Sequence, residues 1–176
     1  KEGERVTSED LVNISVTFDP DVSVVAEMKD KEAYAAQEAA RTGHAVITTV
    51  HAKSAEATYS RMCTLCMLKH NMDYQIVDKL VREAFPIVVY AKKLEDKKRH
   101  IMTIAECVID EHGRSHINIL WKYKVISNEY DSTGKCVIEG YFEKVNNISD
   151  TLVQHMLENG TPKTVFEKFV TEKGVS

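Results

Sequence analysis

The sequence predicts an α/β domain followed by a smaller part made of antiparallel strands and helices. Two short β-branched runs, 22–26 and 45–50, flank an alanine-rich helical segment, which is the pattern of a parallel strand–helix–strand unit. From residue 101 the pattern changes to alternating strands joined by turn sequences, which is typical of antiparallel sheet. We therefore expect one domain over 1–100 and an appended part over 101–176.

The composition is that of an ordinary folded protein. The chain has 176 residues, of which 43% are hydrophobic, enough to build a core. Its net charge of -4 gives no electrostatic footprint for nucleic acid or for an anionic membrane, so we expect no nucleic-acid partner. No apolar run approaches the roughly 18 residues of a membrane span. The chain starts at Lys1 without Met or a signal peptide, so we expect a piece of a longer protein.

Capping and turn residues set the expected boundaries of the elements. We expect Thr7 or Ser8 to cap a first helix, Asp30 to cap the alanine-rich helix, and Ser54 to cap the next one. The first strand, 22–26, is an apolar β-branched run, so we expect it to be buried in a parallel sheet. The remaining expected elements are a helix to about 69, a helix over 73–85, strands over 87–91, 101–109, 116–126 and 135–143, a short helix after 149, and a last helix opened by Pro162.

Polar side chains follow both strands of the predicted parallel unit. Glu27 comes directly after the first strand and His51 after the second. The carboxyl ends of parallel strands meet at one edge of the sheet, where open α/β folds bind ligands. We expect Glu27 and His51 to meet at this edge, with His44 beside them, as the one chemical constellation of the chain.

The four cysteines are interpreted as core residues. Cys63 and Cys66 form a CxxC, but with Tyr59 and Met62 they share one stripe of a helix, and free Cys packs as a small hydrophobe. No second CxxC or nearby His pair completes a set of four zinc ligands. We therefore predict no metal site here, and free thiols suit a reducing compartment.

The order of these motifs resembles the secretion ATPase superfamily, the motors of type II and type IV secretion and of type IV pilus assembly. The resemblance includes a strand ending in Glu27, the charged pair Lys29-Asp30, a helix closed by Thr42-Gly43-His44, then Thr49-x-His51-Ala and Ser-Arg61. Several motifs match together in order and spacing. The sequence is most similar to the tight-adherence (Tad) pilus branch of the superfamily.

The resemblance implies a partial RecA-like, three-layer ATPase core that uses ATP and Mg²⁺. Glu27 falls on the Walker B glutamate, which would orient or deprotonate the attacking water. His44 and His51 fall on the histidine box near the γ-phosphate, so these three residues are the expected catalytic set. Lys29 and Arg61 are the expected nucleotide-binding residues.

The sequence departs from the family pattern at several positions: Lys29 stands where the family usually has Arg and Ala26 where it usually has Gly, and two further differences bear on activity. A motor of this class needs a glycine-rich phosphate loop, but the only Gly-Lys pair in the sequence, Gly134-Lys135, is followed by Cys136 and lies in a predicted hairpin. The resemblance therefore implies the C-terminal portion of the ATPase core without its Walker A loop, inactive by itself. Thr17 and Asp19 stand where the family often has arginines.

The expected function is that of a hexameric motor at the inner face of the cell membrane. The resemblance implies a cytoplasmic, membrane-peripheral ring of identical subunits that works with an inner-membrane platform protein. Two alternatives remain: a non-catalytic structural or interaction subunit of such a ring, and a zinc hydrolase using Glu27, His44 and His51. The charged run 92–100 is interpreted as a solvated turn, with a partner or lipid contact as the alternative.

Overall fold

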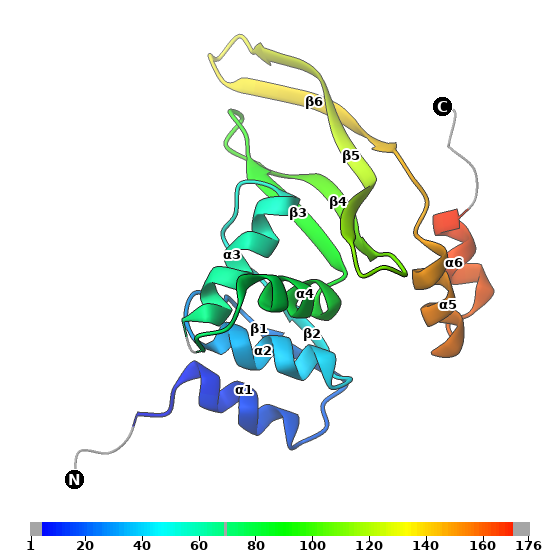
Figure 1. The fold of residues 1–176 in the computed structure, drawn as a ribbon. Coiled ribbons are helices and arrows are strands. Elements are labelled where there is room, and N and C mark those ends of the chain that lie inside the picture. Colours follow the sequence, from blue (N-terminus) through cyan, green and yellow to red (C-terminus); the bar gives the residue numbers. More distant parts are fainter. Residues whose placement is uncertain (1–4, 69, 171–176) are drawn as a thin grey trace. The chain divides into compact units, whose positions relative to one another are not determined.

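The computed structural model describes residues 5–68 and 70–170 (Figure 1). The chain divides into two compact units, Lys1–Pro86 and Ile87–Ser176, and each is described by itself. The expected division into an ATPase-core part over 1–100 and an appendage over 101–176 stays a prediction.

The first unit is built around a parallel strand–helix–strand motif. β1 and β2 pair in parallel, with Val22 opposite Ala45 and Val25 opposite Thr48, and α2 connects them, as the sequence predicted. Buried alanines of α2 let it pack against α1, α3 and α4. The elements of this unit are α1 (Ser8–Val16), β1 (Val22–Val25), α2 (Glu32–Arg41), β2 (Ala45–Thr48), α3 (Ala55–Met67) and α4 (Tyr74–Ala84).

The expectation that the first strand is buried is wrong for one of its faces, and the neighbouring strand is exposed on the same side. Val22, Val24 and Ile47 are 46%, 71% and 59% exposed, whereas Ser23 between the two valines is 8% exposed. Alternate residues of a strand point to opposite faces, and helices of the described part cover the face that carries Ser23. The other face is therefore an open apolar surface.

Two of the three predicted helix caps are confirmed. The side-chain oxygens of Thr7 and Ser54 each accept a backbone N–H of the following helix. The prediction for Asp30 is wrong, because α2 begins at Glu32 with Lys31 at the cap position and no side-chain capping bond. The Glu32 carboxylate instead bonds to the loop that precedes the helix.

Helices α2, α3 and α4 form the core of the first unit. Tyr59 is fully buried and its hydroxyl donates to the Phe85 carbonyl oxygen at 2.7 Å, while the Arg82 guanidinium stacks 4.6 Å from the centre of its ring. Cys63 and Cys66 are buried free thiols on the same side of α3. The prediction that they are core residues is confirmed.

The second unit is a four-stranded antiparallel sheet with two helices after it (Figure 1). The strand order is β3-β4-β5-β6, so each neighbour in the sheet is also the neighbour in sequence. The antiparallel prediction is confirmed, and β3 belongs to this sheet. The elements are β3 (Ile87–Lys93), β4 (Arg99–Ile109), β5 (Ser115–Tyr130), β6 (Cys136–Lys144), α5 (Asp150–Glu158) and α6 (Lys163–Val170).

A buried carboxylate fixes the start of α5 to the sheet. Glu106 on β4 is 3% exposed, and it accepts the backbone N–H of Ser149 at 2.9 Å and the Ser149 hydroxyl. The Ser149 hydroxyl in turn caps α5 by accepting the N–H of Leu152. Among the described residues, no helix combines the length and the apolar character needed to cross a bilayer.

Candidate functional site

Glu27 and His51 meet where the two parallel strands end. Past the strands the two segments stay side by side, because the N–H of Met28 donates to the Thr49 carbonyl at 2.8 Å and the Thr49 hydroxyl donates to the Ala26 carbonyl at 2.6 Å. This pairing brings His51 Nε2 to 3.1 Å from Glu27 Oε1. The meeting of these two side chains at the carboxyl edge, predicted from the sequence, is confirmed.

The pair is open to solvent. The His51 side chain is 94% exposed and that of Glu27 40% exposed. A carboxylate that already contacts an imidazole can accept or orient a proton, and its exposure lets a ligand approach. The arrangement therefore suits positioning of a water or of an oxygen-rich ligand at the sheet edge.

Glu32 anchors the loop that carries Glu27, and the sequence prediction missed it. Its Oε1 atom accepts the backbone N–H of Lys29 at 2.8 Å and that of Asp30 at 3.0 Å. Burial acts to raise the pKa of Glu32, but these N–H donors outweigh burial, so the pKa is lowered overall and the side chain stays ionised. The signal was available, because an acidic residue in the first turn of a helix often bonds to N–H groups before it.

The expectation that His44 lies beside Glu27 and His51 is wrong. His44 directly precedes Ala45, which pairs with the first residue of β1, whereas Glu27 and His51 follow the last residues of the two strands. The four residues of β2 therefore separate His44 from the pair by about 13 Å of strand. His44 instead lies just after α2, where its backbone N–H donates to the Ala39 carbonyl oxygen of that helix at 3.2 Å.

The same geometry removes the zinc interpretation. A His₂Glu zinc site needs all three ligands within about 2 Å of one ion, and residues at opposite ends of a strand cannot meet this condition. The part of the chain that the structure describes holds no group of three or more His, Cys, Asp or Glu placed to bind a metal. The buried Nδ1 atom of His44 has no hydrogen-bond partner among the described residues.

Lys29 and Arg61 are both exposed. Lys29 lies in the loop held by Glu32, two residues after Glu27, and Arg61 lies on α3. Within the described residues Arg61 forms no ion pair, so the salt bridge considered as its alternative role is not seen. The nucleotide-binding role of both residues stays a prediction.

The Gly134-Lys135 pair lies in a hairpin turn, as predicted. Asp131 accepts the backbone N–H groups of Thr133 and Lys135 at 2.8 and 3.0 Å, and Gly134 has a φ of 77°. The backbone N–H groups of this turn are directed to protein oxygens, so the turn is not a phosphate loop.

One group at the sheet edge, the Glu27 carboxylate, is suited to bind Mg²⁺ together with a nucleotide. Mg²⁺ is commonly held by one or two carboxylates together with waters and phosphate oxygens. The single exposed carboxylate of Glu27 can contribute in this way. Within this chain no glycine-rich loop is present to hold the phosphates.

Comparison with known proteins assigns the chain to a family. The sequence profile described as "Type II/IV secretion system protein" matches residues 1–165. The chain therefore belongs to the type II/IV secretion system protein family, as its motifs indicated.

Individual relatives agree with this assignment. The chain is 31% identical over 80 residues to competence protein ComGA of Halalkalibacterium halodurans, covering 45% of the chain and 23% of that protein. It is 38% identical over 61 residues to ComGA of Streptococcus pneumoniae, covering 34% of the chain and 20% of that protein. The structure is similar to that of the VirB11 ATPase of the Brucella suis type IV secretion system in complex with sulphate.

The structural match supports the predicted fold class. The TM-score is 0.54 at 27% sequence identity, over 57% of this chain and 32% of the VirB11 chain. A mixed α/β structure that matches a secretion ATPase is consistent with a partial RecA-like core. The chain spans a third or less of each of these relatives.

Proposed function

We propose that the chain is part of an ATP-hydrolysing motor that powers pilus assembly or protein secretion. The contact between Glu27 and His51 carries this proposal, because it places a carboxylate and an imidazole at the ligand-binding edge of a parallel sheet. Membership of the secretion family and the likeness to an ATPase support it.

In this proposal Glu27 orients the attacking water and takes up its proton. His51, 3.1 Å away, holds the carboxylate in place and contacts the nucleotide side of the site. Glu32 positions both indirectly by fixing the loop after Glu27. Mg²⁺, when bound with ATP, would supply the charge stabilisation that phosphoryl transfer requires, and Lys29 and Arg61 would add cations.

His44 takes a different role in this proposal from that of His51. It lies at the other end of β2, so it acts on the site through the strand and not by contact. A shift of β2 along β1 would move both histidines together, which is a means of coupling the nucleotide state to motion of the subunit.

The parent protein is proposed to form a hexameric ring at the cytoplasmic face of the cell membrane. Its partners would be further copies of itself and an inner-membrane platform protein, and the tight-adherence branch is the proposed subfamily. By itself the 176-residue chain is expected to hydrolyse ATP negligibly, since the phosphate loop would come from another part of the parent. Turnover well above that of a Glu27→Ala variant would contradict this expectation.

The decisive experiment measures ATP turnover by the intact parent protein as wild type and as Glu27→Gln, with particle mass followed in the same samples. Glu111→Gln is the matched control, because the Glu111 side chain is 88% exposed and lies in the turn between β4 and β5 of the second unit. Mg²⁺-dependent turnover that is lost in Glu27→Gln only, with the particle mass unchanged, supports the motor. Equal turnover in all three proteins refutes the role of Glu27.

A non-catalytic ring subunit is the second candidate, and one observation favours it. Thr17 and Asp19 occupy positions where the family often has arginines, and here they end a helix: the Thr17 hydroxyl donates to the Ile14 carbonyl at 2.7 Å. Absence of turnover in wild type and Glu27→Gln, with intact particles, would support this candidate.

A further inference from the structure

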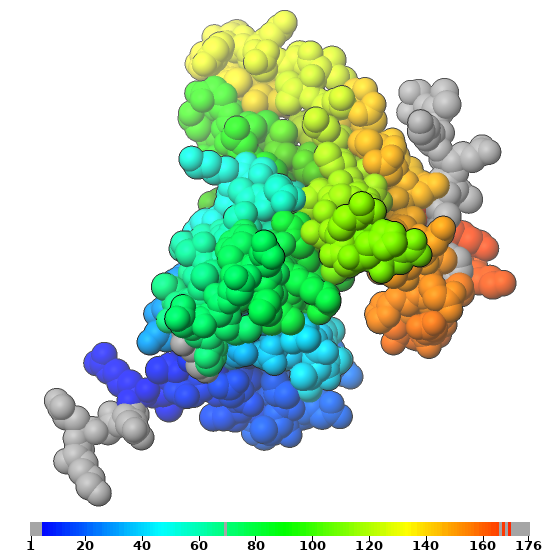
Figure 2. All heavy atoms as spheres, viewed as in Figure 1, coloured from blue at the N-terminus to red at the C-terminus, as the bar shows by residue number. Residues whose placement is uncertain are grey.

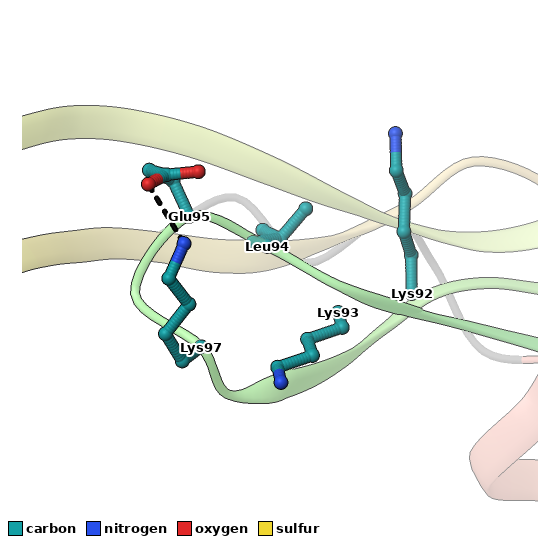
Figure 3. A pocket seen from close by; sticks show the side chains of 5 residues that line it. All are labelled: Lys92, Lys93, Leu94, Glu95 and Lys97. Carbon is teal, nitrogen blue, oxygen red and sulfur yellow. Dashed lines mark hydrogen bonds and ion pairs between the residues drawn. The ribbon is translucent and has the colours of Figure 1, made fainter.

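The turn between β3 and β4 concentrates positive charge in a chain that is acidic as a whole. Residues 92–100 read KKLEDKKRH, with five Lys or Arg against two acidic residues, whereas the whole chain carries a net charge of -4. Figure 3 shows the hollow at this turn, of about 490 Å³, which Lys92, Lys93, Leu94, Glu95 and Lys97 line. We call residues 92–99 the basic hairpin.

The two carboxylates of the basic hairpin are engaged within it. Asp96 is 5% exposed, and it accepts the N–H of Lys98 at 3.0 Å and contacts His100 Nε2 at 2.8 Å. Glu95 bonds to Lys97 at 2.8 Å. Lys92 and Lys93 are exposed and form no ion pair within the described residues, so the hairpin presents uncompensated ammonium groups to solvent.

The backbone conformation of this turn does not favour lysine at position 97. Lys97 has a φ of 62°, a left-handed conformation that glycine or asparagine adopts at lower cost. The turn closes through two backbone bonds of 3.0 Å, from the Leu94 N–H to the Lys98 carbonyl and from the Lys97 N–H to the Leu94 carbonyl. A lysine held in a backbone conformation that glycine adopts at lower cost points to a use for its side chain.

Exposed apolar side chains lie at the same end of the sheet. In an antiparallel sheet of order β3-β4-β5-β6 the β3–β4 and β5–β6 turns lie at the same end, so Tyr130, the last residue of β5, is at the end of the sheet that carries the basic hairpin. Figures 1 and 2 show both hairpin turns at this end of the second unit. Tyr130 is 68% exposed and Ile126 on the same strand 70% exposed. Lysines at the same end of a sheet as exposed Tyr and Ile give this end the composition of a membrane-interface surface.

We propose that the basic hairpin and Tyr130 dock this end of the sheet on a membrane surface that contains anionic lipid. Lysine side chains project from more than one side of the hairpin (Figure 3). This distribution fits a layer of phosphate headgroups that surrounds the tip better than an acidic peptide lying along one side. The proposal refines the membrane-peripheral location proposed above, and it involves no nucleotide.

The experiment is sedimentation of the full 176-residue chain with lipid vesicles, without nucleotide. Vesicles of phosphatidylcholine alone are compared with vesicles that contain about 30% phosphatidylglycerol, at physiological salt. Each lysine near an anionic surface contributes enough that removing two, as in Lys92→Gln/Lys93→Gln, should weaken binding about 30-fold. Lys53→Gln/Lys163→Gln removes the same charge from exposed sites elsewhere and should bind within about 3-fold of wild type.

Further measurements distinguish docking on lipid from a loss of folding and from binding to an acidic protein. Circular dichroism melting of each variant checks that it is folded, and raising the salt should weaken wild-type binding because headgroup contacts are screened. Wild type that fails to bind the anionic vesicles, or that binds both vesicle types equally, would overturn the proposal. So would equal loss in the two double variants, or retention on immobilised polyglutamate without vesicle binding. Because no step uses ATP, these failures would leave the motor proposal untouched.

Discussion

Replacing Glu32 by alanine should destabilise the protein by releasing the loop that carries Glu27. Glu32 is 5% exposed, and its Oε1 atom accepts two backbone N–H groups at 2.8 and 3.0 Å. A hydrogen bond to a charged acceptor is worth about 1.5–3 kcal/mol. Water can reach the donors on the exposed residues Lys29 and Asp30, so the lower value applies to each bond. The expected loss is about 3 kcal/mol.

The assay is urea unfolding at neutral pH, followed by far-ultraviolet circular dichroism. Glu32→Gln keeps the Oε1 acceptor but loses the charge, so it should cost about half as much as Glu32→Ala. Glu38→Ala is the matched control on the same helix, because the Glu38 side chain is 40% exposed and, among the described residues, bonds only to the side chains of Gln37 and Arg41. If Glu32→Ala unfolds within about 0.5 kcal/mol of wild type, the loop is not held by Glu32.

The same residue predicts a dependence on pH. Burial acts to raise the pKa of Glu32, but the backbone N–H donors lower it below the unfolded value. The unfolded state then binds more protons between the two pKa values, so the stabilisation is fully present above the unfolded pKa and is lost as the pH falls through the folded one. The difference in stability between wild type and Glu32→Gln should be constant above about pH 5 and shrink in acid.

Three further changes test the second unit and the core. In Gly140→Ala the added Cβ would overlap the Lys124 carbonyl oxygen, so thermal melting should show a loss of about 2–3 kcal/mol. Burial, with Asp78 as a further cause, raises the pKa of Cys63 to about 12, so this thiol should react with a thiol reagent only after unfolding. Burial acts to raise the pKa of Asp96, but the hydrogen bonds that it accepts outweigh burial and lower this pKa. In an acid titration the chemical shift of the Lys98 amide should therefore change only at pH values below the ordinary aspartate pKa. In Asp96→Asn this change should be absent.

Each of these tests has its own check. Gly113→Asn is the control for Gly140→Ala, because Gly113 has no neighbour within 4 Å of an added Cβ and a φ of 76°, which asparagine tolerates; equal losses would show that Gly140 is not tightly packed. Rapid labelling of Cys63 in the native state would contradict its burial. An unchanged Lys98 amide through the acid titration would show that Asp96 does not hold the turn.

Local chemistry made much of the first unit predictable. Thr7 and Ser54 are predictable as caps because a hydroxyl directly before a helix accepts one of the unpaired N–H groups of its first turn. Asp30 was equally plausible by that rule, but Glu32 competes for the same loop, and a single sequence does not show which carboxylate prevails. The open face of β1 and β2 could not be foreseen either, because burial depends on what covers a strand and not on its own residues.

The sequence predicts those residues of the site whose positions follow from the order of the strands. It does not predict those whose positions depend on the length of a strand. Glu27 and His51 follow parallel strands, so the shared sheet edge brings them together whatever the lengths of the strands. His44 precedes its strand, and its distance from the pair equals the length of that strand. Closeness in sequence therefore misled the prediction for His44, although a count along the strand would have corrected it.

The connections within the two sheets also imply different folding times. β1 and β2 can pair only after the intervening chain has been brought back through α2, which costs loop entropy before any strand contact forms. Each pair of neighbours in β3–β6 is joined by a short turn, so its contacts are local. On refolding, amide protons of the antiparallel sheet should become protected from exchange before those of the strands that lead to Glu27 and His51. The candidate site would then be among the last parts of the chain to acquire its native geometry.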